Sequence, residues 1–201
     1  LPLREKILNV ASATLDKMRA NQEISDLGTA FGCGFGKDCD PDKLRYGRVI
    51  IMTDADVDGA HIASLLLTFF FQQMKPLITA GRVFLAMPPL FRLSTKGKVV
   101  YAHDDADKER LMKSEFKDNQ KVEVSRFKGL GEMNWKHLKE TTMDPDTRSL
   151  LKVNLPKDEG LETTETSLPI EVFIENLMGR KPEKRFDFIQ QNAQFVEDVD
   201  I

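Results

Sequence analysis

An apolar run that ends in three closely spaced aspartates is the feature that most constrains the fold of this chain. Residues 49–52 (VIIM) are rich in β-branched side chains and lead into Asp54, Asp56 and Asp58. Continuous apolar character is typical of a strand buried on both faces, as in a parallel sheet. Alternate residues of an extended chain point to one side, so the three carboxylates are predicted to converge at the carboxyl edge of the sheet. Such carboxylates repel one another unless a cation lies among them, and oxygen ligands favour a hard ion such as Mg²⁺.

Other origins of an Asp-x-Asp-x-Asp-Gly sequence are possible. An EF-hand calcium loop needs Glu at its twelfth position, and counting from Asp54 that position is Leu65. Haloacid-dehalogenase-like phosphatases also run a strand into Asp-x-Asp, but have Thr or Val at the fifth position, where this chain has Asp58. A solvated acidic turn with Asp58 as the helix N-cap accounts for one aspartate and hardly for three.

Composition narrows the class of protein. The 201 residues are 41% hydrophobic and 30% charged, as in ordinary globular proteins. The net charge of -3 means that a role with DNA must rest on local basic patches. The candidate patches are Arg4 with Lys6, residues 43–48, and Arg126, Lys128, Lys136 and Lys139.

The cysteines and the ends of the chain suggest a cytoplasmic protein. Cys33 and Cys39 are too sparse for a zinc site or a disulfide framework, which favours reduced, buried thiols. No apolar run reaches membrane-spanning length and no signal peptide is present, so no membrane role is expected. The chain begins at Leu1 without an initiator Met, which indicates a fragment or a processed piece.

Strand and helix patterns alternate along the first two thirds of the chain. This alternation favours an α/β fold with a parallel sheet, followed from Asn134 by a helical, polar and loop-rich tail. The long apolar helix at residues 61–74 places Leu65, Leu66, Phe69 and Phe70 on its core-facing side. The expected strands are residues 48–53, 83–87 and 121–127, with a hairpin of 90–93 and 99–101, a charged helix at 104–116 and a long loop at 156–167.

A second unusual stretch is residues 126–134, RFKGLGEMN. Gly129 and Gly131 allow the backbone to approach a ligand closely, and Arg126 and Lys128 are suited to phosphates. Taken alone, the stretch is better explained as an ordinary glycine turn with solvated cations.

The two stretches occur together with further motifs in a fixed order. The chain resembles, over nearly its whole length, the C-terminal part of the B subunit of bacterial type IIA DNA topoisomerases. The compact connection between Tyr101 and Arg126 resembles topoisomerase IV more than gyrase. The matching segments are LPLREKILN at 1–9, IMTDADVDGAHI at 51–62, PPLF at 88–91, RFKGLGEMN at 126–134 and ETTMDP at 140–145.

The resemblance implies a TOPRIM domain at residues 1–133, with a small parallel sheet flanked by helices. It implies a helical tail at residues 134–201 that docks on the A subunit, with helices over about residues 168–193. Asp54 and Asp56 then form the Mg²⁺ pair, with Asp58 as a third acid. Asp54, His61 and Lys128 are the implied catalytic residues, and the implied DNA-binding residues are Arg4, Lys6, Arg126 and Lys128.

The resemblance also implies an assembly and an activity. The partner A subunit supplies a tyrosine that cleaves double-stranded DNA, in an expected A2B2 heterotetramer. ATP binds a separate part of the full-length B subunit. Supercoiling by a gyrase is the close alternative, and an Asp-nucleophile phosphatase or a non-catalytic, metal-dependent binding module are alternatives of other classes.

Two departures from the family pattern stand out. The family's metal-binding Glu lies upstream of Leu1, so this stretch alone should not complete the metal site. Glu5 replaces the usual Gly between Arg4 and Lys6, which is expected to weaken phosphate attraction locally unless it points away.

Overall fold

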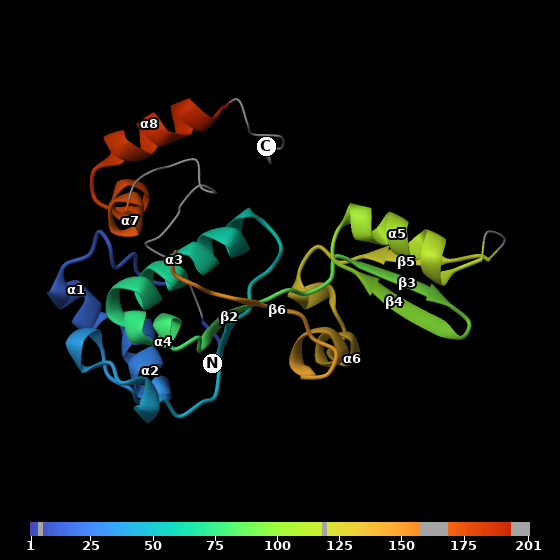
Figure 1. Cartoon of the computed structure of the whole chain (residues 1–201), viewed down its shortest axis with the longest axis horizontal. Helices are drawn as coiled ribbons and strands as arrows, with labels where there is room; N and C mark the ends of the chain where they lie inside the picture. Colours follow the sequence, from blue (N-terminus) through green and yellow to red (C-terminus); the bar gives the residue numbers. More distant parts are fainter. Residues whose placement is uncertain (4–5, 118–119, 157–168, 194–201) are drawn as a thin grey trace. The chain divides into compact units, whose positions relative to one another are not determined.

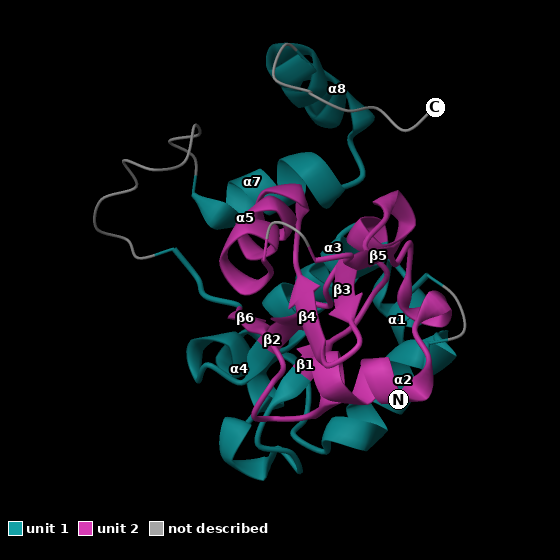
Figure 2. Ribbon diagram, turned by 90° about the vertical axis from the view of Figure 1, so that its right-hand side faces the viewer, with its two compact units in different colours: residues 1–49, 62–83, 153–201 teal, residues 50–61, 84–152 magenta. Residues whose placement is uncertain are grey.

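The computed structural model describes residues 1–3, 6–117, 120–156 and 169–193 (Figure 1). The chain is mixed α/β, with small sheets and a helical C-terminal part, so the expected fold class is confirmed. It forms two compact units, one of residues 1–49, 62–83 and 153–201 and one of residues 50–61 and 84–152 (Figure 2). Arg4 and Glu5, and the expected loop from residue 157 onward, lie outside the described residues.

The first unit is built around the apolar part of helix α3 (Val57–Gln73). Its predicted core residues Leu65, Leu66, Phe69 and Phe70 are all at most 5% exposed. The Phe70 ring also contacts Phe31, with ring centroids 5.8 Å apart. The other helices of this unit are α1 (Leu15–Ala20), α2 (Gln22–Phe31), α4 (Lys75–Thr79), α7 (Ile170–Met178) and α8 (Pro182–Asn192), with 3₁₀ turns η1 (Gly36–Asp38) and η2 (Pro41–Lys43).

Hydrogen bonds hold the tail helix α7 within this unit. Asn9 Nδ2 donates to the Met178 carbonyl at 2.9 Å, and Arg180 Nε donates to the Ser12 carbonyl at 2.7 Å. Lys75 and Glu171 form an exposed ion pair at 2.8 Å. None of the helices in the part of the chain that the structure describes is long and apolar enough to cross a membrane.

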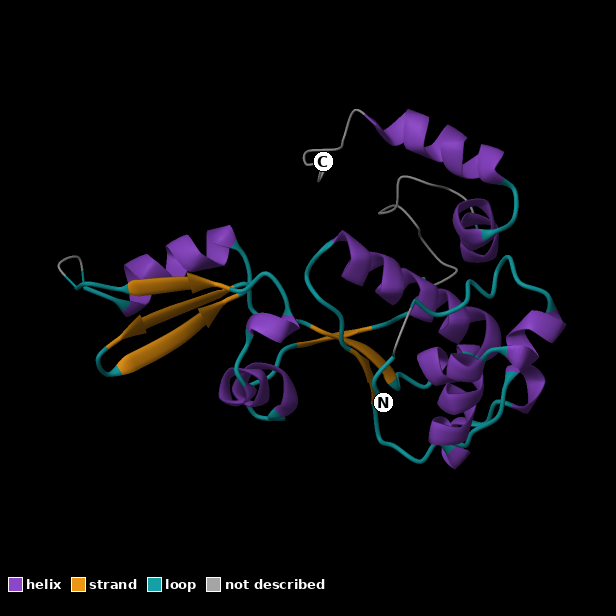
Figure 3. Ribbon diagram, turned by 180° about the vertical axis from the view of Figure 1, so that it is seen from behind, coloured by secondary structure: helices purple, strands orange, loops and turns teal. Residues whose placement is uncertain are grey.

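The second unit contains a three-stranded antiparallel sheet in the order β4-β3-β5 (Figure 3). Its strands are β3 (Phe91–Thr95), β4 (Lys98–Ala102) and β5 (Glu123–Arg126), and α5 (Asp105–Glu115) packs on one face. Phe91, Leu93 and Ala102 pack there with Leu111 and Phe116, all buried. The predicted hairpin, charged helix and strand are thereby confirmed.

A second small sheet has the order β1-β2-β6. It consists of β1 (Val49–Ile51), β2 (Val83–Ala86) and the unexpected β6 (Leu150–Lys152), and β2 and β6 are antiparallel. The parallel pairing expected from the sequence therefore does not extend to the pairs β2–β6, β3–β4 and β3–β5. β3 and β4 meet through a short turn, which reverses the chain and permits only antiparallel pairing.

The remaining helical turns follow β5. They are the 3₁₀ turn η3 (Leu130–Glu132), the short helix α6 (Trp135–Leu138) and the π-helical turn η4 (Lys139–Met143). Asn134 caps α6, because its side-chain oxygen accepts the His137 N–H at 3.0 Å.

Candidate functional site

Asp54 joins the two motifs singled out in the sequence. It lies in the loop after β1, and its Oδ1 accepts the backbone N–H of Leu130 at 2.7 Å. Leu130 belongs to the glycine-containing motif 76 positions further along the chain. The Asp54 side chain remains exposed. The carboxylate is therefore positioned by the second motif and still open to solvent.

Gly129 permits this close approach. A Cβ at Gly129 would lie 3.0 Å from Cγ of Asp54 and 3.1 and 3.2 Å from its two carboxylate oxygens. These separations are tighter than ordinary van der Waals contact, so a side chain at this position would press on the carboxylate. Steric contact with Asp54 thus explains why position 129 is a glycine.

Asp56 is the N-cap of α3. Its Oδ1 accepts the Gly59 N–H at 2.7 Å, and its carbonyl accepts the Ala60 N–H at 2.9 Å. The cap is thus Asp56 and not Asp58, which lies in the first helical turn. Because the helix begins at Val57, the extended alternation predicted for the three aspartates ends before Asp58.

Gly59 also lies against the Asp54 backbone. A Cβ at Gly59 would come within 2.0 Å of the Asp54 carbonyl oxygen, so only glycine fits there. The twelfth position of the considered calcium loop, Leu65, is buried within α3 at 4% exposure. That position cannot supply a calcium ligand, which removes the EF-hand alternative.

The donor chemistry of Asp54 and Asp56 fits a hard divalent cation. Both are exposed carboxylates two positions apart. The hydrogen bonds from the Leu130 N–H to Asp54 and from the Gly59 N–H to Asp56 each use the Oδ1 atom of the carboxylate. A carboxylate offers about four lone-pair positions, so such a bond leaves room for a cation. Within the described residues, no group of three or more His, Cys, Asp or Glu side chains is placed to hold a metal. Asp54 and Asp56 by themselves offer two carboxylate ligands, fewer than a hard divalent cation takes.

The cations of the second motif flank the buried Phe127. Arg126 and Lys128 are both exposed, whereas the Phe127 N–H donates to the Leu90 carbonyl at 2.8 Å. The Lys128 N–H donates to Glu132 Oε2 at 2.7 Å, which closes the turn and leaves the ammonium group to solvent. Arg126 also has its guanidinium carbon 5.8 Å from the Phe91 ring centroid.

Of the other predicted site residues, His61 lies exposed in the second turn of α3. It belongs to the same compact unit as Asp54, Arg126 and Lys128. Lys6 is exposed and belongs to the other unit, while Arg4 falls outside the described residues.

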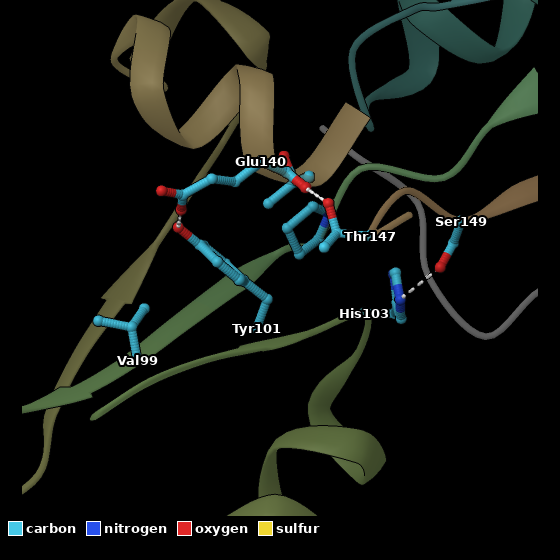
Figure 4. A pocket seen from close by; sticks show the side chains of 8 residues that line it. Val99, Tyr101, His103, Glu140, Thr147 and Ser149 are labelled. Carbon is cyan, nitrogen blue, oxygen red and sulfur yellow. Dashed lines mark hydrogen bonds between the residues drawn. The ribbon is translucent and has the colours of Figure 1, made fainter. Parts of the chain in front are cut away.

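A pocket that the sequence did not predict lies on the face of β4 opposite α5 (Figure 4). Tyr101 Oη donates to Glu140 Oε2 at 3.0 Å, and Thr147 Oγ1 donates to the Glu140 carbonyl. Ser149 Oγ lies 3.4 Å from His103 Nε2. Burial, followed by the hydrogen bond to Glu140, raises the pKa of Tyr101 to about 12. The ETTMDP motif signalled Glu140, but nothing in the sequence paired it with Tyr101.

Two family models match the chain. One, "Toprim domain", covers residues 1–88, and the other, "DNA gyrase B subunit, carboxyl terminus", covers residues 119–190. The first therefore includes the aspartate motif and the second the glycine motif. The chain thus carries a Toprim domain and a gyrase B carboxyl-terminal domain, as expected from its resemblance to the C-terminal part of the B subunits of type IIA DNA topoisomerases.

Individual relatives agree with this assignment. The chain is 56% identical over 201 residues to the B subunit of DNA topoisomerase 4 from Bartonella bacilliformis, and 56% identical over 202 residues to that from Caulobacter vibrioides. It is 48% identical over 201 residues to the B subunit of DNA gyrase from Halalkalibacterium halodurans. Each comparison covers all of this chain but only 28 to 30% of the relative, so the chain spans less than a third of their length.

Proposed function

We propose that this chain is the metal-binding part of an ATP-dependent type IIA DNA topoisomerase. It supports double-strand cleavage and religation of DNA by a tyrosine of a partner A subunit, in an A2B2 assembly in the cytoplasm. The observation that carries the proposal is the hydrogen bond from Leu130 to Asp54, which joins the aspartate motif to the glycine motif.

Asp54 and Asp56 would hold Mg²⁺, with a further ligand from the Glu that the family carries upstream and Asp58 as a third nearby acid. When bound, the ion would supply charge stabilisation at the leaving sugar oxygen and an anchor for the scissile phosphate. Leu130 and Gly129 fix the Asp54 carboxylate, and Gly59 fixes its backbone.

The exposed cations have separate roles. Lys128 and Arg126 bind phosphates on either side of the cleaved bond, and His61 assists near the scissile phosphate as a hydrogen-bonding group. Arg4 and Lys6 meet DNA along a basic strip. ATP hydrolysis drives strand passage from a domain outside this chain.

The test is Asp54→Ala in the full-length B subunit assembled with its A subunit. Mg²⁺-dependent plasmid cleavage should fall by about 100-fold or more, since metal-held charge stabilisation is worth several kcal/mol. ATP hydrolysis should be largely retained. Asp42→Ala, at an exposed aspartate of the other unit, is the matched control and should cleave normally. Normal cleavage and relaxation by Asp54→Ala would reject the metal assignment and favour a non-catalytic binding module.

Topoisomerase IV and gyrase activities remain to be separated by experiment. Relatives of both names are similar to the chain. We favour a topoisomerase IV-like enzyme because the connection between Tyr101 and Arg126 is compact. Decatenation without negative supercoiling would support this assignment, and ATP-driven supercoiling of relaxed plasmid would identify a gyrase.

A further inference from the structure

The chain's one tryptophan, Trp135, is strongly exposed directly after the glycine motif. It is the first residue of α6 and is 71% exposed. Lys136 Nζ lies 5.5 Å from the centroid of its ring. A large aromatic ring and a cation therefore stand together on the surface (α6 in Figure 1).

The opposite side of α6 anchors it to the unit. The His137 ring lies 5.9 Å from the Phe127 ring and 6.2 Å from the Tyr101 ring, measured between centroids. Asn134 caps the helix through the His137 N–H. Trp135 and Lys136 are exposed whereas His137 is half-buried, so the outward position of the indole is fixed by packing.

Trp135 is also close to the candidate metal site. Met133, two positions before it, is buried and lines a small cavity together with Ala55, Gly129 and Leu130. Ala55 lies between the two proposed metal ligands. Two residues of chain span at most about 7 Å, so α6 begins next to this site.

We infer that Trp135 and Lys136 form a DNA contact beside the cleavage site, with the indole packed against the nucleotides and the ammonium on a phosphate. This inference rests on the proposed function. Charge favours DNA over a protein partner, because Lys128, Lys136 and Lys139 are exposed, whereas the two acids of this segment, Glu132 and Glu140, accept hydrogen bonds from the Lys128 N–H and the Tyr101 hydroxyl. An indole packed against the sugar–phosphate backbone of a duplex does not read base identity, as an enzyme that cleaves many sites requires.

The experiment measures the affinity of a fluorescently labelled duplex for the assembled full-length A and B subunits. Trp135→Ala should weaken binding about tenfold, because the packing of a large aromatic ring in the interface is lost, and Trp135→Phe should restore most of the affinity. Lys136→Gln should make the negative slope of log affinity against log salt shallower by about one. Leu15→Ala, a control at a hydrophobic residue that is 66% exposed in the other unit, should bind like wild type.

The outcomes separate this inference from the proposed function. If Trp135→Ala binds and cleaves DNA like the wild-type complex, the tryptophan contact is rejected and the topoisomerase proposal stands. A second outcome concerns the A subunit. If Trp135→Ala weakens the association of the two subunits on gel filtration, but the complex that does form binds DNA like wild type, Trp135 contacts protein and the inference is also rejected. If the wild-type complex neither binds nor cleaves the duplex, both proposals fail.

Discussion

At the scale of single residues, the half-buried Tyr101 links a hydrogen bond to the pH dependence of stability. Its hydroxyl donates to Glu140 at 3.0 Å, and its pKa is raised to about 12 from the usual 10.0. Between these two pH values the unfolded tyrosine has lost its proton while the folded one keeps it. The stability from this group is therefore complete below about pH 10 and declines as the pH rises toward 12.

Replacement of Tyr101 by Phe should remove this component of the pH dependence. The variant should lose stability less steeply than wild type between about pH 10 and 12, as measured by urea unfolding followed by circular dichroism. Tyrosinate absorbance should also lose its highest-pH step. An unchanged high-pH step in Tyr101→Phe would mean that the other tyrosine, Tyr46, is responsible; Tyr46→Phe is the matched control.

At the scale of elements, the start of α3 combines a structural and a chemical role in one residue. Asp56 caps the helix through the Gly59 N–H and is also a proposed metal ligand. Asn caps helices about as well as Asp but carries no charge. The substitution Asp56→Asn therefore separates the two roles.

We expect Asp56→Asn to keep the thermal stability of wild type in EDTA while losing metal-dependent cleavage. Asp56→Ala should lose both, with a stability loss of about 1 kcal/mol from the absent cap. Thermal unfolding with and without Mg²⁺, together with a cleavage assay, makes the comparison. If Asp56→Asn cleaves like wild type, the charge of Asp56 is not needed to hold the metal.

At the scale of the whole molecule, charge decides how DNA can be attracted. The net charge is -3, so the proposed attraction of DNA must rest on local cations, for which Arg126 and Lys128 are the candidates. Each phosphate contact releases counterions, so removing one such contact should make the negative slope of log affinity against log salt shallower by about one. We expect Lys128→Gln and Arg126→Gln in the assembled complex each to make the slope shallower by this amount, measured by titration at several salt concentrations.

The control is Lys113→Gln, at an exposed lysine of α5 in the same unit. It should leave the slope unchanged if attraction is local to the site. If Lys113→Gln, Lys128→Gln and Arg126→Gln all changed the salt slope equally, DNA would be attracted by the positive charge of the whole surface and not by the motif in particular.

Local patterns in the sequence determined most of the secondary structure and the family. The apolar period of α3 predicted its core side, and the β-branched run at residues 49–51 predicted β1, because both signals arise between near neighbours in the chain. The combination of the DxDxDG and KGLGE motifs indicated the type IIA topoisomerase B subunits. The roles of Asp54, Asp56, Asp58, His61 and Lys128 stay predictions.

Only the tertiary structure decided what lies against what. The Leu130–Asp54 hydrogen bond, the steric need for Gly129 and the Tyr101–Glu140 pair join residues far apart in sequence, and no periodicity encodes such distances. The shift of the helix cap from Asp58 to Asp56 has a related cause, because three aspartates at equal spacing are equivalent until backbone N–H groups select one. The strand β6 was likewise not predicted, because its three residues are too few to show a strand pattern in the sequence. It forms by antiparallel pairing with β2, which is distant in sequence.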